Sequence, residues 1–285
     1  MRVLKTVAAM QLACKEIRAV TRSLGFVPTM GALHEGHLSL VRRARAECDS
    51  VVASIFVNPL QFGPTEDFDQ YPRTFEADCA VLEGEGVEIL FAPSVGEMYP
   101  GGAVTTVTVA GVGDRLDGAS RPGHFTGVAT VVAKLLHVVS ADRAYFGKKD
   151  AAQLAVLRTM VRDLNFPVEL VGCGIVRDGD GLALSSRNRY LSAVDRGRAL
   201  VLRRVLLDMM WRISGGTWAS DALYAAGLEI LASEPHVRLD YLAIVDADTL
   251  LKVEEAKPGT LVAIAAYVGT TRLIDNFVVG SGDEL

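Results

Sequence analysis

The stretch LGFVPTMGALHEGH, residues 24–37, joins a short apolar run to a glycine-punctuated turn and then to a helical pattern at 37–48. A strand that leads directly into a helix is the first part of a βαβ unit. In open α/β sheets, ligands bind at the carboxyl ends of strands, and a helix N-terminus offers free backbone N–H groups to a phosphate. The stretch therefore predicts a parallel sheet with an anion-binding turn.

The same alternation continues on both sides of this stretch. The expected strands are 24–28, 50–57, 87–91, 141–146 and 168–171, and the helical patterns are 37–48, 75–84, 127–139 and 150–164. The spacing of Val7, Met10, Cys14 and Ile17 adds an N-terminal amphipathic helix. Strands that alternate with helices predict a Rossmann-like, doubly wound α/β sheet covered on both faces.

The pattern changes after residue 172. Two helical patterns at 193–212 and 220–234 precede strand-like runs at 239–245, 260–266 and 272–279. This order is typical of a smaller α+β domain. We therefore expect a Rossmann-like domain over 1–175 and a C-terminal α+β lid domain over 176–285.

Composition excludes several classes of protein. The 285 residues carry 29 Lys+Arg against 34 Asp+Glu, a net charge of -5, which argues against binding to nucleic acid. No apolar stretch is long enough to span a membrane. The four cysteines are far apart and include no Cys-x-x-Cys pair, so we expect neither a zinc ribbon nor a disulfide framework, and we expect a cytoplasmic location.

Two histidines mark the glycine-punctuated turn. His34 and His37 are three residues apart, so on a first helical turn both could donate to the same phosphate oxygens. Gly31 and Gly36 would let the backbone approach a ligand closely. The His-Glu-x-x-His spacing of zinc proteases, the phosphate loop and the Gly-x-Gly-x-x-Gly fingerprint are absent from this turn.

Two further clusters carry groups suited to a nucleotide. In FGKKD, residues 146–150, a lysine could meet phosphate as a point charge and Asp150 could cap a helix or bind ribose. In LSSR, residues 184–187, hydroxyls and a guanidinium could close over a triphosphate. Taken alone, the FGKKD cluster is equally typical of a solvated lysine pair. The LSSR cluster, taken alone, is also typical of an ordinary helix N-cap.

Eight ordered motifs carry a resemblance that spans nearly the whole chain. They are PTMGALHEGH (28–37), FVNPLQF (56–62), YPRT (71–74), RPGHFTGV (121–128), FGKKD (146–150), LALSSRNRYL (182–191), DADTL (246–250) and RLIDN (272–276). Together they resemble the pantothenate synthetase (pantoate–β-alanine ligase) family, which belongs to the superfamily of HIGH-motif nucleotidylyltransferases and class I aminoacyl-tRNA synthetases.

The resemblance implies a two-step, ATP- and Mg²⁺-dependent ligation in the biosynthesis of pantothenate and coenzyme A. The carboxylate of (R)-pantoate would attack the α-phosphate of ATP to give pantoyl adenylate and diphosphate. The amine of β-alanine would then displace AMP and form pantothenate. It also implies a homodimer. Because the substrate carboxylate attacks, no protein nucleophile is needed, and catalysis reduces to positioning and charge stabilisation.

The resemblance also implies roles for individual residues. Nucleotide binding would fall to Met30, Gly31, Ala32, Leu33, His34, Glu35, Gly36, His37, Gly147, Lys148, Lys149, Asp150, Val176, Leu184, Ser185, Ser186 and Arg187. Catalysis would fall to His34, His37, Lys149, Ser185, Ser186 and Arg187, with His37 as the proton donor. Gln61, Gln153, Asn58 and Met30 would bind the substrates pantoate and β-alanine, and Asp78 would contact the metal.

Four positions depart from the family pattern. Lys148 stands where a glutamate is common, Ala151 and Ala152 replace an aromatic residue and a glutamine, and Ala77 replaces an acidic residue. They bear on the affinity for ATP and on the metal geometry.

Two alternatives stay open. One is a nucleotidylyltransferase of the same superfamily that leaves AMP on its product, although Gln61 and Gln153 favour a small polyol acid over a nucleotide acceptor. The other is a non-catalytic nucleotide sensor, which would be favoured if these departures abolish turnover. A tRNA-charging enzyme is less well supported, because no anticodon domain or basic stripe is evident.

Overall fold

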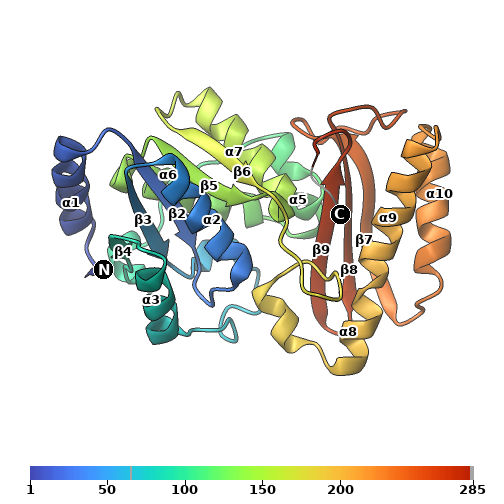
Figure 1. Cartoon of the computed structure of the whole chain (residues 1–285), viewed down its shortest axis with the longest axis horizontal. Coiled ribbons are helices and arrows are strands. Elements are labelled where there is room, and N and C mark those ends of the chain that lie inside the picture. Colours follow the sequence, from blue (N-terminus) through green and yellow to red (C-terminus); the bar gives the residue numbers. More distant parts are fainter. Residues whose placement is uncertain (65, 283–285) are drawn as a thin grey trace. The chain divides into compact units, whose positions relative to one another are not determined.

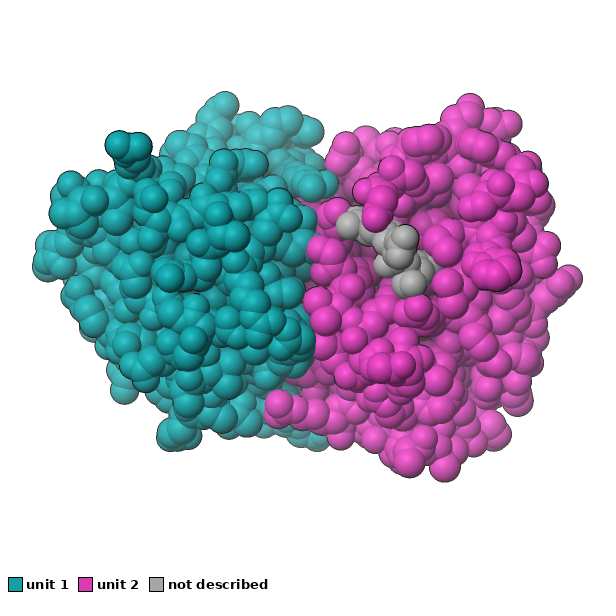
Figure 2. All heavy atoms as spheres, viewed as in Figure 1, with its two compact units in different colours: residues 1–147, 156–173 teal, residues 148–155, 174–285 magenta. Residues whose placement is uncertain are grey.

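The computed structural model describes residues 1–64 and 66–282. The chain forms two compact units, coloured separately in Figure 2. Unit 1 comprises Met1–Gly147 and Val156–Cys173, and unit 2 comprises Lys148–Ala155 and Gly174–Leu285. Within the described residues, no helix combines the length and apolar character needed to cross a membrane.

Unit 1 is built on a six-stranded sheet in which every pairing is parallel (Figure 1). Its strands are β1 (Arg2–Leu4), β2 (Leu24–Thr29), β3 (Ser50–Ile55), β4 (Ile89–Phe91), β5 (Arg143–Gly147) and β6 (Glu169–Cys173), in the order β1-β4-β3-β2-β5-β6. The predicted Rossmann-like sheet is confirmed. Strand β1 was not predicted, because three residues are too few to show a pattern.

Helices cover both faces of this sheet. They are α1 (Val7–Val20), α2 (Glu35–Glu47), α3 (Phe75–Gly84), α4 (Val95–Met98), α5 (Asp117–Ser120) and α6 (His124–Val139), with single 3₁₀ turns η1 (Pro59–Gln61) and η2 (Val112–Asp114). Leu40 and Val41 of α2 and Leu82 of α3 pack in one core with Val27 and Val51 of the strands. Right-handed crossovers then place α1 and α6, which contact each other, on the opposite face.

The sheet has a topological switch point at β2. This strand pairs with β3 on one side and with β5 on the other, and Phe26 lies opposite Ala144. Three residues further along each strand, β2 reaches Thr29 and β5 reaches Gly147. The glycine-punctuated turn and the start of the KKD segment therefore leave the same edge of the sheet, where α/β proteins bind ligands.

Unit 2 contains a three-stranded antiparallel sheet, β7 (Val237–Asp246), β8 (Thr260–Val268) and β9 (Thr271–Val278), in that order. Its helices are α8 (Ala193–Ala199), α9 (Val201–Ser214) and α10 (Ser220–Leu231), with 3₁₀ turns η3 (Lys148–Asp150) and η4 (Ser186–Tyr190). The helix α7 (Ala151–Asp163) begins in unit 2 and ends in unit 1. Leu202, Leu206, Ile264 and Phe277 belong to the apolar core of α9 and the sheet.

Two features of unit 2 differ from the sequence-based prediction. The single helix expected over 193–212 is two helices that meet at Leu200, whose dihedral angles (φ -62, ψ -14) remain helical. The expected boundary at residue 175 also assigned residues 148–155 to the first domain, whereas their contacts group them with unit 2. Hydrogen bonds from β9 to the backbone of Lys148 and Lys149 account for this grouping.

Candidate active site

The turn between β2 and α2 is held by the buried carboxylate of Asp78 in α3. Its Oδ2 accepts the backbone N–H of Ala32 at 2.9 Å, its Oδ1 accepts that of Leu33 at 2.9 Å, and the Thr74 hydroxyl donates to Oδ1 at 3.1 Å. Both oxygens are thus committed to the protein. Asp78 therefore supports the turn, and the metal contact that the resemblance implies for it stays a prediction.

Gly31 is the one position in this turn where only glycine is accommodated. Its φ is +81°, and a Cβ atom there would lie 3.0 Å from both Asp78 Oδ2 and Ile55 Cγ2. The following residue, Ala32, also has a positive φ, of 51°. The bonds from Asp78 stabilise this unusual backbone, which turns the chain into α2.

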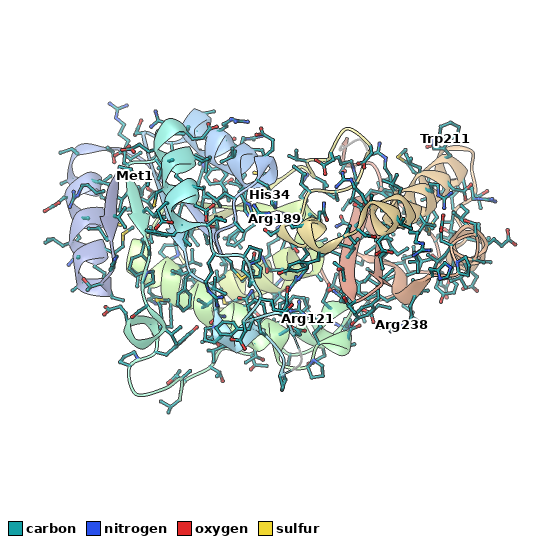
Figure 3. All side chains as sticks on the ribbon, turned by 90° about the horizontal axis from the view of Figure 1, so that it is seen from below. Met1, His34, Arg121, Arg189, Trp211 and Arg238 are labelled. Carbon is teal, nitrogen blue, oxygen red and sulfur yellow. The ribbon has the colours of Figure 1, made fainter. Side chains whose placement is uncertain are left out.

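His34 is the N-cap of α2 and His37 lies one turn inside it (Figure 3 labels His34). The backbone N–H of His34 donates to Nδ1 of His37 at 3.3 Å, so neutral His37 carries its hydrogen on Nε2. The two rings lie 4.1 Å apart. The helix start adds a positive potential at the same place. The role of His37 as a donor to phosphate stays a prediction.

Glu35 lies in the same segment, but its side chain belongs to the helix surface. Its carboxylate pairs with Arg42, which also pairs with Glu85 at 2.6 Å. The Arg42 and Glu35 side chains are about half exposed. Any contribution of Glu35 to nucleotide binding would therefore come from its backbone.

Asn58 and Gln61 form an amide cluster beside the turn. Asn58 is almost fully buried, and its Nδ2 donates to Gln61 Oε1 and to the Gly127 carbonyl, both at 3.1 Å, while its Oδ1 accepts the Tyr99 hydroxyl at 2.7 Å. Gln61 Nε2 lies 3.2 Å from the sulfur of Met30. The structure thus brings together three of the four predicted substrate-binding residues.

The backbone of Gln61 is fixed by the RPGH segment at the start of α6. Arg121 donates to the Gln61 carbonyl at 3.3 Å and pairs with Glu66 through two bonds of 2.7 and 2.6 Å. Arg121 also donates to His124 Nε2 at 2.9 Å, so His124 Nδ1 carries the hydrogen and donates to the Gln61 carbonyl at 2.8 Å. This carbonyl therefore accepts two side-chain donors.

Burial and the charge of Arg121 lower the pKa of His124 from 6.5 to about 4, which keeps it neutral and in this tautomer. Burial acts to raise the pKa of Glu66, but hydrogen bonds and the charge of Arg121 outweigh it and lower this pKa to about 2. The network consequently holds a neutral imidazole and a charged carboxylate throughout the neutral range.

Gly127 allows α6 to touch the 3₁₀ turn η1, which carries Gln61. A Cβ atom at this position would lie 2.2 Å from the Leu60 carbonyl oxygen and 2.7 Å from the Gln61 backbone nitrogen. No side chain is compatible with these distances unless the turn moves. Gly127, the second glycine in RPGHFTGV, thus has a packing role directly beneath the amide cluster.

Gly147 ends β5 in unit 1, and unit 2 holds the remaining predicted site residues. Lys148, Lys149 and Asp150 form the turn η3, and Asn276 Nδ2 donates to the carbonyls of Lys148 and Lys149 at 3.1 and 2.8 Å. Gln153 follows, half-buried, in the first turn of α7.

The predicted closing loop is a β-like hairpin. The Leu184 N–H donates to the Val176 carbonyl at 2.9 Å, and Arg177 bridges to Ala183. Ser185 caps η4 by accepting the Arg187 N–H at 3.2 Å, and Ser186 is buried. Val176, Leu184, Ser185, Ser186 and Arg187 therefore form one ordered segment, whose roles toward a nucleotide stay predictions.

Several residues that support these segments had no role in the sequence-based prediction. They are Glu66, Tyr99, Arg121, His124, Gly127, Asp275 and Asn276. RPGHFTGV and RLIDN are among the motifs that carry the family resemblance, but the hydrogen-bond partners of their side chains are far away in the sequence. Tyr99 carried no sequence signal at all.

The fold places the chain among Rossmann-like α/β proteins, which bind ligands at the switch point of the sheet. The family model for pantoate-beta-alanine ligase matches residues 2–278. The chain belongs to this family and is an enzyme of this class, a ligase that forms pantothenate.

Curated relatives and solved structures agree with the family model. The pantothenate synthetase of Acidobacterium capsulatum is 60% identical over 291 residues, 98% of this chain and 97% of the relative, and that of Koribacter versatilis is 57% identical over 279 residues, 98% and 96%. The crystal structure of the Thermus thermophilus enzyme has a TM-score of 0.93 at 52% identity, covering 98% of this chain and 99% of that one.

A third structure carries ligands. It is the pantoate-beta-alanine ligase of Francisella tularensis complexed with beta-gamma ATP and beta-alanine, with a TM-score of 0.78 at 32% identity over the full length of both chains.

Proposed function

We propose that this enzyme condenses (R)-pantoate with β-alanine at the expense of ATP, through a pantoyl adenylate, and that it thereby serves pantothenate and coenzyme A biosynthesis. The observation that carries the proposal is the amide cluster of Asn58 and Gln61, which meets Met30 beside the His34–His37 helix start. The ATP analogue and β-alanine in the Francisella tularensis structure support the same substrates.

The first half-reaction needs an acceptor site and a place for the departing charge. A carboxylate oxygen of pantoate attacks the α-phosphorus, the bond to the β-phosphate bridging oxygen breaks, and diphosphate leaves with the electron pair. Gln61 suits pantoate, because an amide can both donate to a carboxylate and accept from a hydroxyl. His37, whose Nδ1 already accepts the His34 N–H, is our proposed donor to the developing diphosphate through Nε2, and His34 assists it.

The second half-reaction needs only positioning. The β-alanine amine attacks the acyl carbon, AMP leaves, and the amine loses its proton. We place β-alanine near Asn58, Gln61 and Met30, and pantoate against Gln61 and Gln153. This division rests on the amide cluster and on the family resemblance.

The nucleotide roles of unit 2 rest on its sequence motifs. We propose that Lys149 binds the phosphates and assists catalysis with Ser185, Ser186 and Arg187, that Asp150 binds the ribose, and that Val176 meets the adenine. Gly147, Lys148 and Leu184 would line the nucleotide. Within unit 1, the segment Met30 to His37 would supply its backbone N–H groups.

Magnesium enters this proposal only as a companion of ATP. Among residues 1–64 and 66–282, no group of three or more His, Cys, Asp or Glu side chains is arranged to hold a metal ion. Mg²⁺ in nucleotide enzymes is bound largely by phosphates and water. Asp78 is the one protein contact that we propose for it, and we assign it no step. A cytoplasmic homodimer remains our expectation for the state in which the enzyme works.

The test separates the half-reactions. Purified protein is given ATP, Mg²⁺ and (R)-pantoate, and diphosphate is measured; β-alanine is then added, and AMP and pantothenate are measured. We expect up to one diphosphate per enzyme first and multiple turnover afterwards. Diphosphate without AMP release would indicate a nucleotidylyltransferase. ATP binding without pantoate-dependent diphosphate would indicate a nucleotide sensor.

A further inference from the structure

Strand β9 contacts both segments of unit 2 that carry predicted nucleotide-binding residues. It touches η3, which contains Lys149, and η4, which contains Ser186 and Arg187. The RLIDN motif, residues 272–276, lies within this strand. Two of its polar residues, Asp275 and Asn276, are both only 4% exposed. Buried polar side chains persist where they have defined hydrogen-bond partners.

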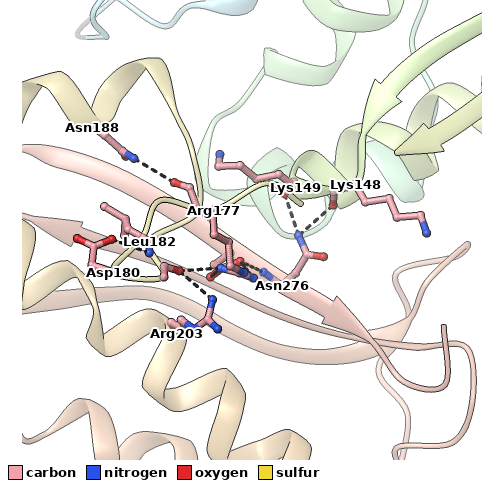
Figure 4. Close-up of polar contacts among 11 residues, drawn as sticks. Lys148, Lys149, Arg177, Asp180, Leu182, Asn188, Arg203 and Asn276 are labelled. Atoms are coloured by element: carbon pink, nitrogen blue, oxygen red, sulfur yellow. Dashed lines mark hydrogen bonds and ion pairs between the residues drawn. The ribbon is translucent and has the colours of Figure 1, made fainter. Parts of the chain in front are cut away.

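Asn276 holds the lysine turn through its side-chain amide. Nδ2 has two hydrogens, and it donates one to the Lys148 carbonyl and one to the Lys149 carbonyl (Figure 4). These bonds fix the backbone carbonyls that precede and follow the Cα atom of Lys149. The position from which the lysine side chain starts is therefore set by a residue more than one hundred positions away.

Asp275 links the same strand to the hairpin of the predicted closing loop. Arg177 pairs with its carboxylate through two bonds of 2.8 and 3.0 Å, and the Arg177 side chain is 10% exposed. Arg177 also donates to the Gly181 carbonyl at 3.2 Å, and Arg203 donates to the same carbonyl at 3.1 Å. The Asn276 backbone N–H donates to Asp275 Oδ1 at 2.8 Å. A continuous set of bonds thus joins the lysine turn to the hairpin (Figure 4).

We infer that Asp275 and Asn276 are positioning residues for ATP binding, which hold Lys149 and the 176–187 hairpin in one geometry. This inference rests on the proposed role of Lys149 toward the phosphates. The side chains of Asp275 and Asn276 suit the groups that they bind. An amide can donate to two carbonyls, whereas a carboxylate at position 276 would repel them, and a carboxylate at 275 can accept a bidentate guanidinium.

The chain offers a matched control on the same strand. Arg272 of β9 pairs with Asp240 of β7 at 2.6 Å, and their side chains are 14% and 15% exposed. This pair resembles Arg177–Asp275 in chemistry and burial, but it links β9 to β7 within the antiparallel sheet. Asp240→Asn should therefore lower stability without a specific effect on ATP.

The experiment is a double-mutant cycle read by the Kd for ATP, measured calorimetrically with ATP and Mg²⁺ on the full chain. We expect Lys149→Ala and Asn276→Ala each to raise Kd by about tenfold, and the double variant to be within about twofold of Lys149→Ala, because both act through one turn. Asn276→Ser, whose shorter side chain does not reach the two carbonyls, should raise Kd to a similar extent. Asp240→Asn should leave Kd within about twofold of the parent value.

Three results would overturn the inference. An unchanged Kd in folded Asn276→Ala, with the expected loss in Lys149→Ala, would refute the inference and leave the proposed role of Lys149 standing. Losses that multiply in the double variant would show that Asn276 does not act through the lysine. No loss in Lys149→Ala would refute the proposed role of Lys149 and the inference with it. If Asn276→Ala does not fold, Asn276→Ser replaces it in the cycle, and the same Kd results decide.

Discussion

The β2–α2 turn of unit 1 and the lysine turn of unit 2 are supported by opposite chemistry. In unit 1 the supported groups are backbone N–H donors, and the residue beneath them is the carboxylate of Asp78. In unit 2 they are backbone carbonyls, and the residue beneath them is the amide of Asn276. Each support comes from a distant part of the chain. The residues that we propose to meet a ligand, His34, His37 and Lys149, lie in these two supported turns.

The largest effect on kcat should come from substitution of His37, a residue of unit 1. We expect His37→Ala to lower kcat by roughly 10²–10⁴-fold while thermal stability changes little, because the side chain would act on charge that develops in the transition state. Diphosphate release with saturating pantoate is the measurement. His137→Ala, in the last turn of α6, is the matched control. Near-normal turnover in folded His37→Ala would remove His37 from the chemistry.

A second substitution acts on the floor of the amide cluster. Gly127→Ala would place a methyl group 2.2 Å from the Leu60 carbonyl oxygen, so η1 must move and carry Gln61 with it. We expect the KM for pantoate to rise by about tenfold or more, with a smaller change for ATP. Gly84→Ala, where no atom lies within 4 Å of the added carbon, should leave both values unchanged. Equal kinetics in the two variants would show that Gly127 does not fix the cluster.

A third substitution replaces the carboxylate that supports the β2–α2 turn with an amide, the group that supports the lysine turn of unit 2. Asp78→Asn keeps the shape but turns an amide N–H₂ toward a backbone N–H donor. We expect a loss of about 1–3 kcal/mol in the free energy of unfolding and a raised KM for ATP, since a buried donor loses its acceptor. Asp49→Asn is the control, because Asp49 also accepts two backbone N–H groups, those of Arg22 and Ser23, but on an exposed loop. A KM for ATP equal in both variants would contradict the assignment of Asp78.

The smallest effect concerns pH. The pKa of His124 is about 4 in the folded chain against 6.5 as its ordinary value, so the unfolded chain binds more protons between these two values. The free energy of unfolding should therefore fall as the pH is lowered from about 6.5 towards 4. On the order of 1 kcal/mol of this fall should disappear in His124→Gln. Chemical denaturation at several pH values measures it, and an identical pH slope in both proteins would contradict the neutral, buried state of His124.

Much of unit 1 was predictable because local patterns determine it. The alternation of short apolar runs and helical patterns predicts β2 to β6 and α1, α2, α3, α6 and α7. Parallel strands bring their carboxyl ends to one edge of the sheet, independently of the loop conformations. The same logic located the turn that carries His34 and His37, and it placed Gly147 at that edge.

The supporting residues were not predictable, because their roles depend on contacts between distant segments. Nothing near Asp78 shows that it will accept N–H groups from residues 32 and 33, and nothing near Asn276 indicates the carbonyls of residues 148 and 149. Residues 148–155 follow a strand of unit 1 in sequence but group with unit 2 for the same reason. A hydrogen-bond partner that is far along the chain leaves no periodic trace in the sequence.

The most direct test of the adenylate route follows one oxygen atom. Pantoate labelled with ¹⁸O in both carboxylate oxygens is incubated with ATP, Mg²⁺ and β-alanine, and the AMP and diphosphate are analysed by mass spectrometry. Attack of the carboxylate on the α-phosphorus predicts one ¹⁸O atom in each AMP and none in the diphosphate. AMP without label, or label in inorganic phosphate, would contradict the pantoyl adenylate and with it the proposed function.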